Sequence, residues 1–168
     1  LTTRVGPRCI AASEMSDEAL VRLVIEYGAK ISFATKDGRM PLHRAVERGH
    51  EAVTRLLIQK GNGADVSAGD EGGLTSLHLA VQLGDSSMAW LLVKNGADVS
   101  VADKYGRTPL YRALEKVLDV VARLLVERGA NVDAATKMGG RHFIWLRVRE
   151  RSGGPAAHRE RSASVNCR

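Results

Sequence analysis

The sequence predicts an all-α solenoid of stacked helix–turn–helix units, joined by short β-turn fingers. The evidence is clearest in residues 103–135, which read as turn, short helix, short helix, turn. Pro109 follows Thr108 as the first helical residue follows an N-cap. Apolar residues then recur at helical spacing, and Gly129 stands where a helix ends. Neither helix is long enough to be stable alone in water, so the unit requires similar units beside it.

Equivalent glycines recur along the chain with a period near 33 residues. Gly106 lies 33 residues after Gly73, and Gly73 lies 35 residues after Gly38. The two extra residues of the longer interval fit at positions 62–63. A fixed period of this length indicates a repeat protein.

The first helix of each unit opens with a related motif. It reads MPLHRA at 40–45, TSLHLA at 75–80 and TPLYRA at 108–113. A period near 33 with a Thr-Pro-Leu-His-x-Ala core resembles the ankyrin repeat, and the resemblance covers roughly residues 6–140. It implies helix pairs stacked around a continuous apolar core and recognition of a protein partner on the concave side.

The repeat register divides the chain into six segments. We predict a degenerate first repeat, three full repeats, an incomplete fifth repeat and an Arg-rich disordered tail, at residues 1–36, 37–69, 70–102, 103–135, 136–151 and 152–168. In the first repeat, Asp17 to Glu26 is expected to be helical, with a buried side of Leu20, Val21, Leu23 and Val24. The abrupt loss of the pattern after Gly139 also fits a shifted reading frame or a retained intron.

Two positions depart from the repeat pattern. Met40 stands where Thr caps the helix in other repeats, and a missing cap costs about 1 kcal/mol. In the fourth repeat the inter-helix Gly-His becomes Val117-Leu118. A β-branched residue resists the left-handed conformation that Gly takes in such a turn. We therefore expect this turn to be rebuilt.

The positive charge is concentrated at the C-terminal end. The net charge is +6, yet residues 1–140 hold 18 Lys and Arg against 17 Asp and Glu, whereas residues 141–168 hold seven Arg and two Glu. Arg-Glu-Arg-Ser at 149–152 and 159–162 suits a basophilic kinase. Such a segment also suits loose electrostatic binding of nucleic acid or a membrane surface. We rank specific nucleic-acid binding low, because few aromatic residues accompany the arginines.

The sequence favours a reducing compartment. Its two cysteines, Cys9 and Cys167, lie at opposite ends of an elongated array, so we expect no disulfide between them. No apolar run reaches the roughly 18 residues that a membrane span needs, and the start lacks the pattern of a signal peptide. We expect a cytoplasmic protein, with the nucleus as the alternative. Because the chain begins at Leu1 rather than Met, we also expect a fragment of a longer protein.

The sequence contains no pattern of catalytic or metal-binding residues. His43 and His78 occupy the His position of the motif, and the ankyrin resemblance implies that they tie neighbouring repeats together. Zinc requires converging ligands at short spacing, whereas these two are 35 residues apart with no Cys nearby. The glycines at 61–65 and 69–73 follow no strand and precede no Lys-Ser/Thr pair, so they do not form a phosphate loop. We expect no enzyme activity, cofactor, metal or small-molecule substrate.

Partner-binding residues are expected at the fingertips and on the inner helices, where the ankyrin resemblance places recognition. The predicted set is Lys36, Asp37, Arg44, Arg48, Glu71, Leu79, Leu83, Lys104, Tyr105, Arg112 and Lys116. Leu79 and Leu83 form an apolar centre with a charged rim, and Tyr105 adds an amphipathic anchor. We expect Arg112→Ala to leave folding nearly intact. The alternative is that these are ordinary surface residues of a scaffold.

Trp90 is a further candidate on the opposite side. It shares an outer-helix column with Arg22, Arg55 and Arg123, which indicates a solvated face. An exposed Trp is a common binding anchor. The alternative for Trp90 is packing across a neighbouring helix.

The combined expectation is a non-catalytic protein–protein interaction module, acting as a scaffold or adaptor for a protein partner of unknown identity. One alternative is a regulatory or targeting segment of a larger protein whose catalytic or nucleotide-binding domain is elsewhere. Another is electrostatic binding of nucleic acid or a membrane through the Arg-rich end. A third is a truncated product without a settled function.

Overall fold

The fold is a row of helix pairs. The computed structural model describes residues 6–28, 31–60 and 64–133, so the predicted fifth repeat, the tail and its motifs lie outside the described residues. The helices in this part are α1 (Gly6–Glu14), α2 (Glu18–Glu26), α3 (Pro41–Glu47), α4 (Glu51–Lys60), α5 (Ser76–Leu83), α6 (Ser86–Lys94), α7 (Pro109–Glu115) and α8 (Asp119–Glu127). The same ranges contain no strand, and the predicted all-α class is confirmed.

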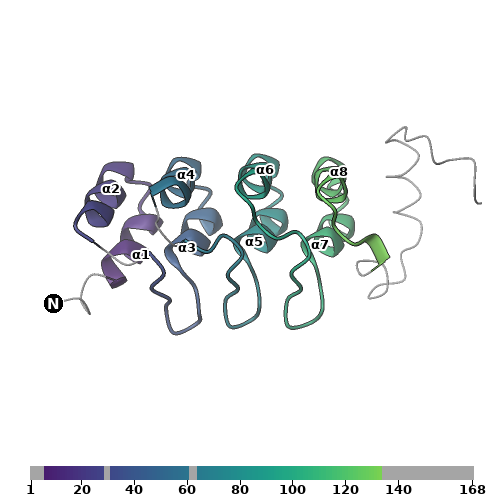
Figure 1. Ribbon diagram of the computed structural model, residues 1–168, viewed down its shortest axis with the longest axis horizontal. Helices are drawn as coiled ribbons and strands as arrows, with labels where there is room; N and C mark the ends of the chain where they lie inside the picture. Colours follow the sequence, from purple (N-terminus) through teal and green to yellow (C-terminus); the bar gives the residue numbers. More distant parts are fainter. Residues whose placement is uncertain (1–5, 29–30, 61–63, 134–168) are drawn as a thin grey trace, which may run out of the picture.

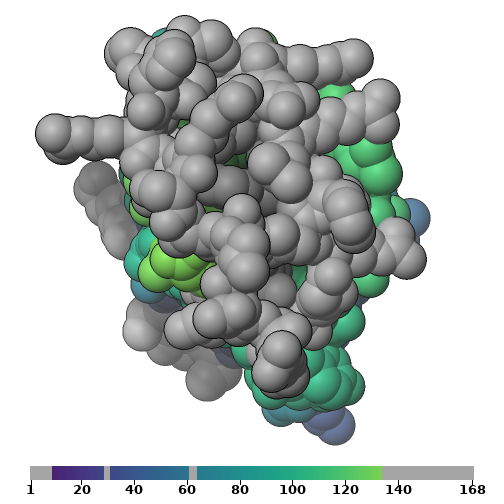
Figure 2. Space-filling model, turned by 90° about the vertical axis from the view of Figure 1, so that its right-hand side faces the viewer, coloured from purple at the N-terminus to yellow at the C-terminus, as the bar shows by residue number. Residues whose placement is uncertain are grey.

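The helices form two layers. Figure 1 shows α1, α3, α5 and α7 side by side in an inner row, and α2, α4, α6 and α8 in an outer row beside it. The loops before α3, α5 and α7 project away from the outer row as three fingers. Figure 2 looks along the rows from the α8 end, with the later repeats in front of the earlier ones. The predicted solenoid of stacked helix pairs is thus confirmed.

Equivalent positions of the inner helices build the core. Two positions are buried in all four helix pairs, namely Cys9, Leu42, Leu77 and Leu110, and three residues later Ala12, Ala45, Ala80 and Ala113. The outer helices add leucines such as Leu57 and Leu92. Ile58 and Val66 pack against both halves of the core, so the apolar interior continues from the first pair to the last.

The first helix pair is complete but asymmetric. Asp17 caps α2, since its Oδ1 accepts a hydrogen bond from the backbone N–H of Leu20 at 3.0 Å. Val21 is fully buried, as predicted. Leu23 is 50% exposed, so its predicted burial is wrong. The physical reason is that α2 packs on α1 and α4, and Leu23 lies on a side that neither helix covers.

The helix starts follow the predicted capping. Thr108 accepts a hydrogen bond from the N–H of Tyr111 at 3.2 Å and so caps α7. At the start of α3, Met40 makes no side-chain cap, as predicted. The N–H of Met40 instead donates to Nδ1 of His43 at 3.2 Å.

The inter-helix turn of the fourth repeat keeps the geometry of the other repeats. Val117 takes a φ of +58°, and the N–H of Leu118 donates to the carbonyl of Ala113 at 2.9 Å. Gly84 occupies the same place in the third repeat with a φ of +76°. The expected rebuilding of this turn is therefore wrong. The turn's hydrogen bonds and the packing of α7 on α8 outweigh the left-handed strain at Val117.

Candidate partner-binding site

The fingers are turns braced by an aspartate or, in the second repeat, by Thr35, whose Oγ1 accepts a hydrogen bond from the N–H of Arg39 at 3.2 Å. In the third repeat, Oδ1 of Asp70 accepts hydrogen bonds from the backbone N–H groups of Gly72 and Leu74, at 2.8 and 3.0 Å. In the fourth, Oδ1 of Asp103 accepts from those of Tyr105 and Arg107, both at 2.9 Å. Such Asx turns hold the backbone without help from a sheet. The fingers thus have a fixed shape.

Neighbouring fingers are also bonded to one another. The N–H of Glu71 donates to the carbonyl of Asp37 at 3.2 Å, and that of Lys104 donates to the carbonyl of Gly72 at 2.9 Å. Gly38 has a φ of +74°, and a Cβ on it would lie 2.6 Å from the backbone nitrogen of Glu71. Only glycine fits this close approach. The three fingertips therefore stand in a rigid row.

Asp103 anchors the fourth finger to the inner helix. Its carboxylate, with a side chain 1% exposed, lies 2.9 Å from Nε of Arg107 and 3.0 Å from Nη2 of Arg112. Burial opposes ionisation, but hydrogen bonds from the Arg107 backbone and the Arg112 side chain prevail and hold the pKa of Asp103 below its usual range. The carboxylate stays charged and joins finger to helix.

Two histidines connect the inner helices α3 and α5 to the finger that follows each of them. Nε2 of His43 lies 3.0 Å from the carbonyl of Leu74, and Nε2 of His78 lies 2.9 Å from that of Arg107. Their Nδ1 atoms accept from backbone N–H groups, so Nε2 carries the proton and donates. Burial lowers the pKa of both histidines. These contacts agree with the expected structural role.

The structure divides the predicted binding residues into three groups. The exposed ones are Lys36, Asp37, Arg48, Glu71, Leu83, Lys104, Tyr105, Lys116 and Trp90. Arg44 and Arg112 are partly buried. Leu79 is only 6% exposed and lies within the apolar core, so the expectation that it faces a partner is wrong. Leu83, at 56% exposed, is left as the accessible leucine of α5.

The two partly buried arginines already have partners. Arg44 lies 3.1 Å from Glu47, 3.3 Å from Asp37 and 3.5 Å from Glu14. Arg112 pairs with the buried Asp103. The expectation that Arg112→Ala spares the fold is therefore not supported, because the change removes one of the two arginine partners of a buried charge.

Tyr105 is the prominent side chain of the fingertip row. It is 58% exposed, and its ring centroid lies 4.5 Å from Cζ of Arg107 and 5.1 Å from Nζ of Lys104. Both cations hold the ring in place through cation–π attraction. Beside it, a shallow hollow of about 300 Å³ is lined by fingertip residues such as Asp37, Glu71 and Leu74.

Trp90 lies on the outer helix α6 and is 46% exposed. Nζ of Lys94 lies 4.8 Å from its ring centroid. Trp90 is therefore accessible to a partner, although Lys94 lies over its ring.

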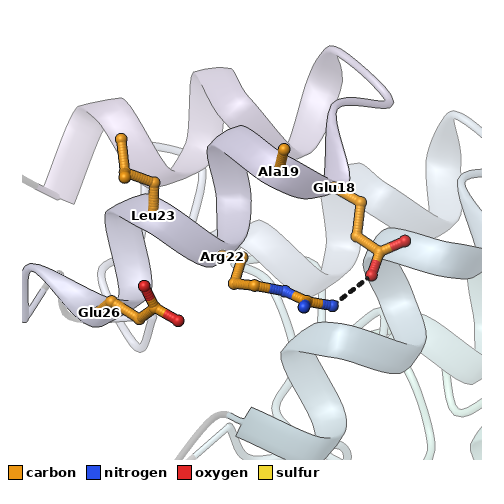
Figure 3. A pocket seen from close by; sticks show the side chains of 5 residues that line it. All are labelled: Glu18, Ala19, Arg22, Leu23 and Glu26. Atoms are coloured by element: carbon orange, nitrogen blue, oxygen red, sulfur yellow. Dashed lines mark hydrogen bonds and ion pairs between the residues drawn. The ribbon is translucent and has the colours of Figure 1, made fainter.

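A second hollow lies on α2. Glu18, Ala19, Arg22, Leu23 and Glu26 line it, and Arg22 pairs with Glu18 at 2.8 Å (Figure 3). The register of the repeats explains why the apolar Leu23 lines this hollow. At the position of Leu23, the second and third repeats have leucines that are 4% and 2% exposed. The hollow is thus the uncovered end of a row whose interior leucines are covered.

Sequence reasoning missed two exposed valines. Val117 is 58% exposed and Val120 is 72% exposed, at the turn between α7 and α8. The sequence does indicate that the position of Val120 is exposed, because the equivalent residues of the other repeats are small or polar, namely Ala19, Ala52 and Ser87.

The described residues carry no sign of a metal site or a membrane span. Across 6–28, 31–60 and 64–133, no group of three or more His, Cys, Asp or Glu side chains is placed to hold a metal ion. Within those ranges no helix has the length and apolar character needed to cross a bilayer.

Two family models match the sequence. One, for ankyrin repeats in three copies, matches residues 9–103, and one for a single ankyrin repeat matches residues 105–137. The chain belongs to the ankyrin repeat family, and the resemblance is confirmed. Ankyrin repeats are protein-interaction modules and are generally non-catalytic.

Curated relatives carry similar repeats in different contexts. The chain is 32% identical over 73 residues to the ADP-ribosylation factor GTPase-activating protein AGD4 of Arabidopsis thaliana. It is 39% identical over 83 residues to the potassium channel AKT1 of Oryza sativa subsp. japonica, and 30% identical over 91 residues to the NF-kappa-B inhibitor cactus of Drosophila melanogaster. The alignments cover 44%, 49% and 53% of this chain, but 9%, 9% and 18% of the relatives.

Proposed function

We propose that these repeats bind a protein partner, without catalysis, through the fingertips and the exposed ends of the inner helices. The residues that carry binding are Lys36, Asp37, Glu71, Lys104 and Tyr105 on the fingers, with Arg48, Leu83 and Lys116 on the helices. Arg44 and Arg112 contribute by fixing the carboxylates around them. Trp90 is a secondary anchor on the outer face.

The rigid row of fingers is the observation that carries this proposal. Each finger is braced internally and bonded to the next, and Tyr105 is held by two cations. A partner that binds such a surface orders few groups, so little of the interaction energy is lost to entropy. Tyr with a polar rim is a favoured composition for interfaces.

One relative supports a protein partner. Cactus is named as an inhibitor of NF-kappa-B, that is, as a protein that acts on another protein. By analogy, we propose an adaptor or scaffold role. The low cysteine content supports the cytoplasm as its location, with the nucleus as the alternative.

A pull-down with a matched control tests the proposal. The test variant is Tyr105→Ala/Lys104→Glu. The control is Tyr27→Ala/Lys60→Glu, which alters exposed residues of the same types at the C-cap of α2 and on α4. Both are first shown to be folded by circular dichroism. We expect one partner to be retained by the wild type and the control and lost by the test variant. Equal recovery by all three proteins contradicts a fingertip site.

A second candidate is a regulatory or targeting segment of a larger protein. The observation that favours it is that matched regions make up 9% of AGD4 and of AKT1. Full-length transcript sequencing tests this: an open reading frame that adds a further domain supports it, and one that ends at these repeats contradicts it. The same transcript sequences show whether the reading frame continues after residue 139, and they therefore also test the alternative of a truncated product.

A third candidate is electrostatic binding through residues 141–168, which lie outside the described part of the chain. Its support is their charge alone, with seven Arg and two Glu. Deleting them should abolish salt-sensitive binding of nucleic acid or anionic vesicles, whereas salt-insensitive binding contradicts it.

A further inference from the structure

Apolar side chains gather at the turns of the third and fourth repeats. Leu83 ends α5, while Val117 and Val120 flank the start of α8, and all three are more than half exposed. The two turns are adjacent, because a Cβ on Gly84 would lie 3.9 Å from Cδ2 of Leu118. We call Leu83, Val117 and Val120 the turn patch.

The backbone at the turn patch lowers the local stability of the fourth repeat. Val117 is a β-branched residue at a φ of +58°, where the second and third repeats have Gly49 and Gly84. Left-handed backbone is disfavoured for such a residue. A Gly at position 117 would remove the strain and the exposed apolar side chain at that position.

The helix cap is missing at the same turn. Asp17 and Asp85 cap α2 and α6 with a side-chain oxygen, whereas Leu118 precedes α8 and makes no cap hydrogen bond. Two unfavourable features and three exposed apolar side chains thus coincide. Strain that persists in a fold is a ground for inferring function.

Charge next to the patch indicates the chemistry of its occupant. Arg48, Leu83 and Lys116 occupy the same position at the ends of α3, α5 and α7, which lie side by side (Figure 1). Within the described residues neither cation has an ion-pair partner. The exposed Glu115 offsets Lys116, and Asp119 lies between the two valines. The unpaired positive charge of this edge is therefore that of Arg48, at the end of α3.

We propose that the turn patch binds an amphipathic helix of a protein partner, with its apolar side on Leu83, Val117 and Val120 and a carboxylate directed toward Arg48. An amphipathic helix that lays its apolar face, with anchors at helical spacing, against a hydrophobic surface is one of the common modes of peptide recognition. The inference rests on the proposed interaction function and extends it from the fingertips to the turn edge.

The experiment uses the full chain and a phage-displayed library of random 16-residue peptides. Peptides enriched on the wild type are synthesised, and their Kd is measured by fluorescence polarisation at two salt concentrations. We expect apolar residues at i, i+3 and i+4 with a terminal Asp or Glu. Their affinity should fall about tenfold for Leu83→Asp and for Arg48→Glu, and less for Lys116→Glu. Higher salt should weaken binding.

Two controls separate recognition from folding. Met15→Asp alters the exposed residue equivalent to Leu83 in the first repeat and should leave the Kd unchanged. Val117→Gly/Leu118→Asp restores the Gly-Asp turn of the third repeat and should bind about tenfold more weakly while unfolding at a higher urea concentration. If this variant binds as well as the wild type, the proposal is overturned.

Further measurements distinguish peptide binding at the turn patch from binding at the fingertips and from binding to a lipid surface. Peptides that lose affinity with Tyr105→Ala but not with Leu83→Asp support the fingertip site and overturn the turn patch. Absence of any enriched peptide overturns the turn patch as a peptide site. Co-sedimentation with phosphatidylserine vesicles that Leu83→Asp abolishes would assign the patch to a membrane surface instead.

Discussion

Arg112 and Asp103 form an ion pair that joins helix α7 to the finger before it, with 3.0 Å between Nη2 and Oδ2. The Asp103 side chain is 1% exposed and that of Arg112 11% exposed, so water screens the pair little. The same carboxylate braces the finger backbone, and a single side chain thus fixes both the shape of the finger and its position.

Removing this carboxylate should destabilise the fold strongly. Asp103→Ala leaves the Arg112 charge buried and the N–H groups of Tyr105 and Arg107 without their acceptor, and breaking such a pair typically costs about 3–5 kcal/mol. Arg112→Ala should cost less, because Arg107 still pairs with Asp103. Urea unfolding measures both. As a control, Arg22→Ala breaks an exposed pair and should change stability by about 0.5 kcal/mol or less.

Core leucines should differ according to their place in the row. Leu57→Ala and Leu92→Ala remove fully buried side chains and should each cost about 2–5 kcal/mol. Leu23→Ala changes the same residue type where it is 50% exposed, and the cost should be roughly half that or less. Equal losses at Leu23 and Leu57 in urea melts would contradict the assigned repeat register.

Stability should fall in mildly acidic solution. The folded state holds the pKa of His43 and His78 below the ordinary value, so below about pH 6.5 the unfolded chain binds more protons than the folded one. Their contribution is fully present above that pH and is lost as pH falls toward the lowered pKa. The free energy of unfolding, measured between pH 7.5 and 5, should decline. A flat profile would show that the two imidazoles are not held neutral.

Repair of the fourth turn should stabilise the protein. Val117→Gly relieves left-handed strain of about 1–2 kcal/mol. The greater conformational entropy of glycine in the unfolded chain offsets part of this gain. Leu118→Asp restores a cap worth about 1 kcal/mol. The double variant should therefore show a higher urea midpoint with an unchanged m-value. A lower midpoint would mean that Val117 and Leu118 contribute more packing than their exposure indicates.

The repeat architecture was predictable because local interactions along the chain determine it. The left-handed positions Gly38, Gly73 and Gly106 mark the fingers, and the Thr-Pro-Leu-His motif marks the helix starts. These features act within a few residues of chain, so their spacing reveals the register. The structural role of His43 and His78 followed from the same motif.

The details of the surface were not predictable in this way. Whether Leu79 is buried depends on how the inner helices pack, and whether Leu23 is exposed depends on which helices cover α2. The partner of Arg112 lies nine residues away on a finger. At Val117, the tertiary structure imposes a conformation that the residue itself disfavours. Each outcome depends on contacts between segments rather than on local sequence.

Site-specific photo-crosslinking tests the central claim, that the fingertips bind a protein partner, most directly. Benzoylphenylalanine is placed at Tyr105 in one sample and in another at Tyr27, a more exposed tyrosine at the C-cap of α2. We predict that after irradiation in cells a defined crosslinked protein forms at position 105 and not at position 27, and that Glu71→Lys weakens it. Crosslinks at position 27 alone, or at neither position, would contradict the fingertip site.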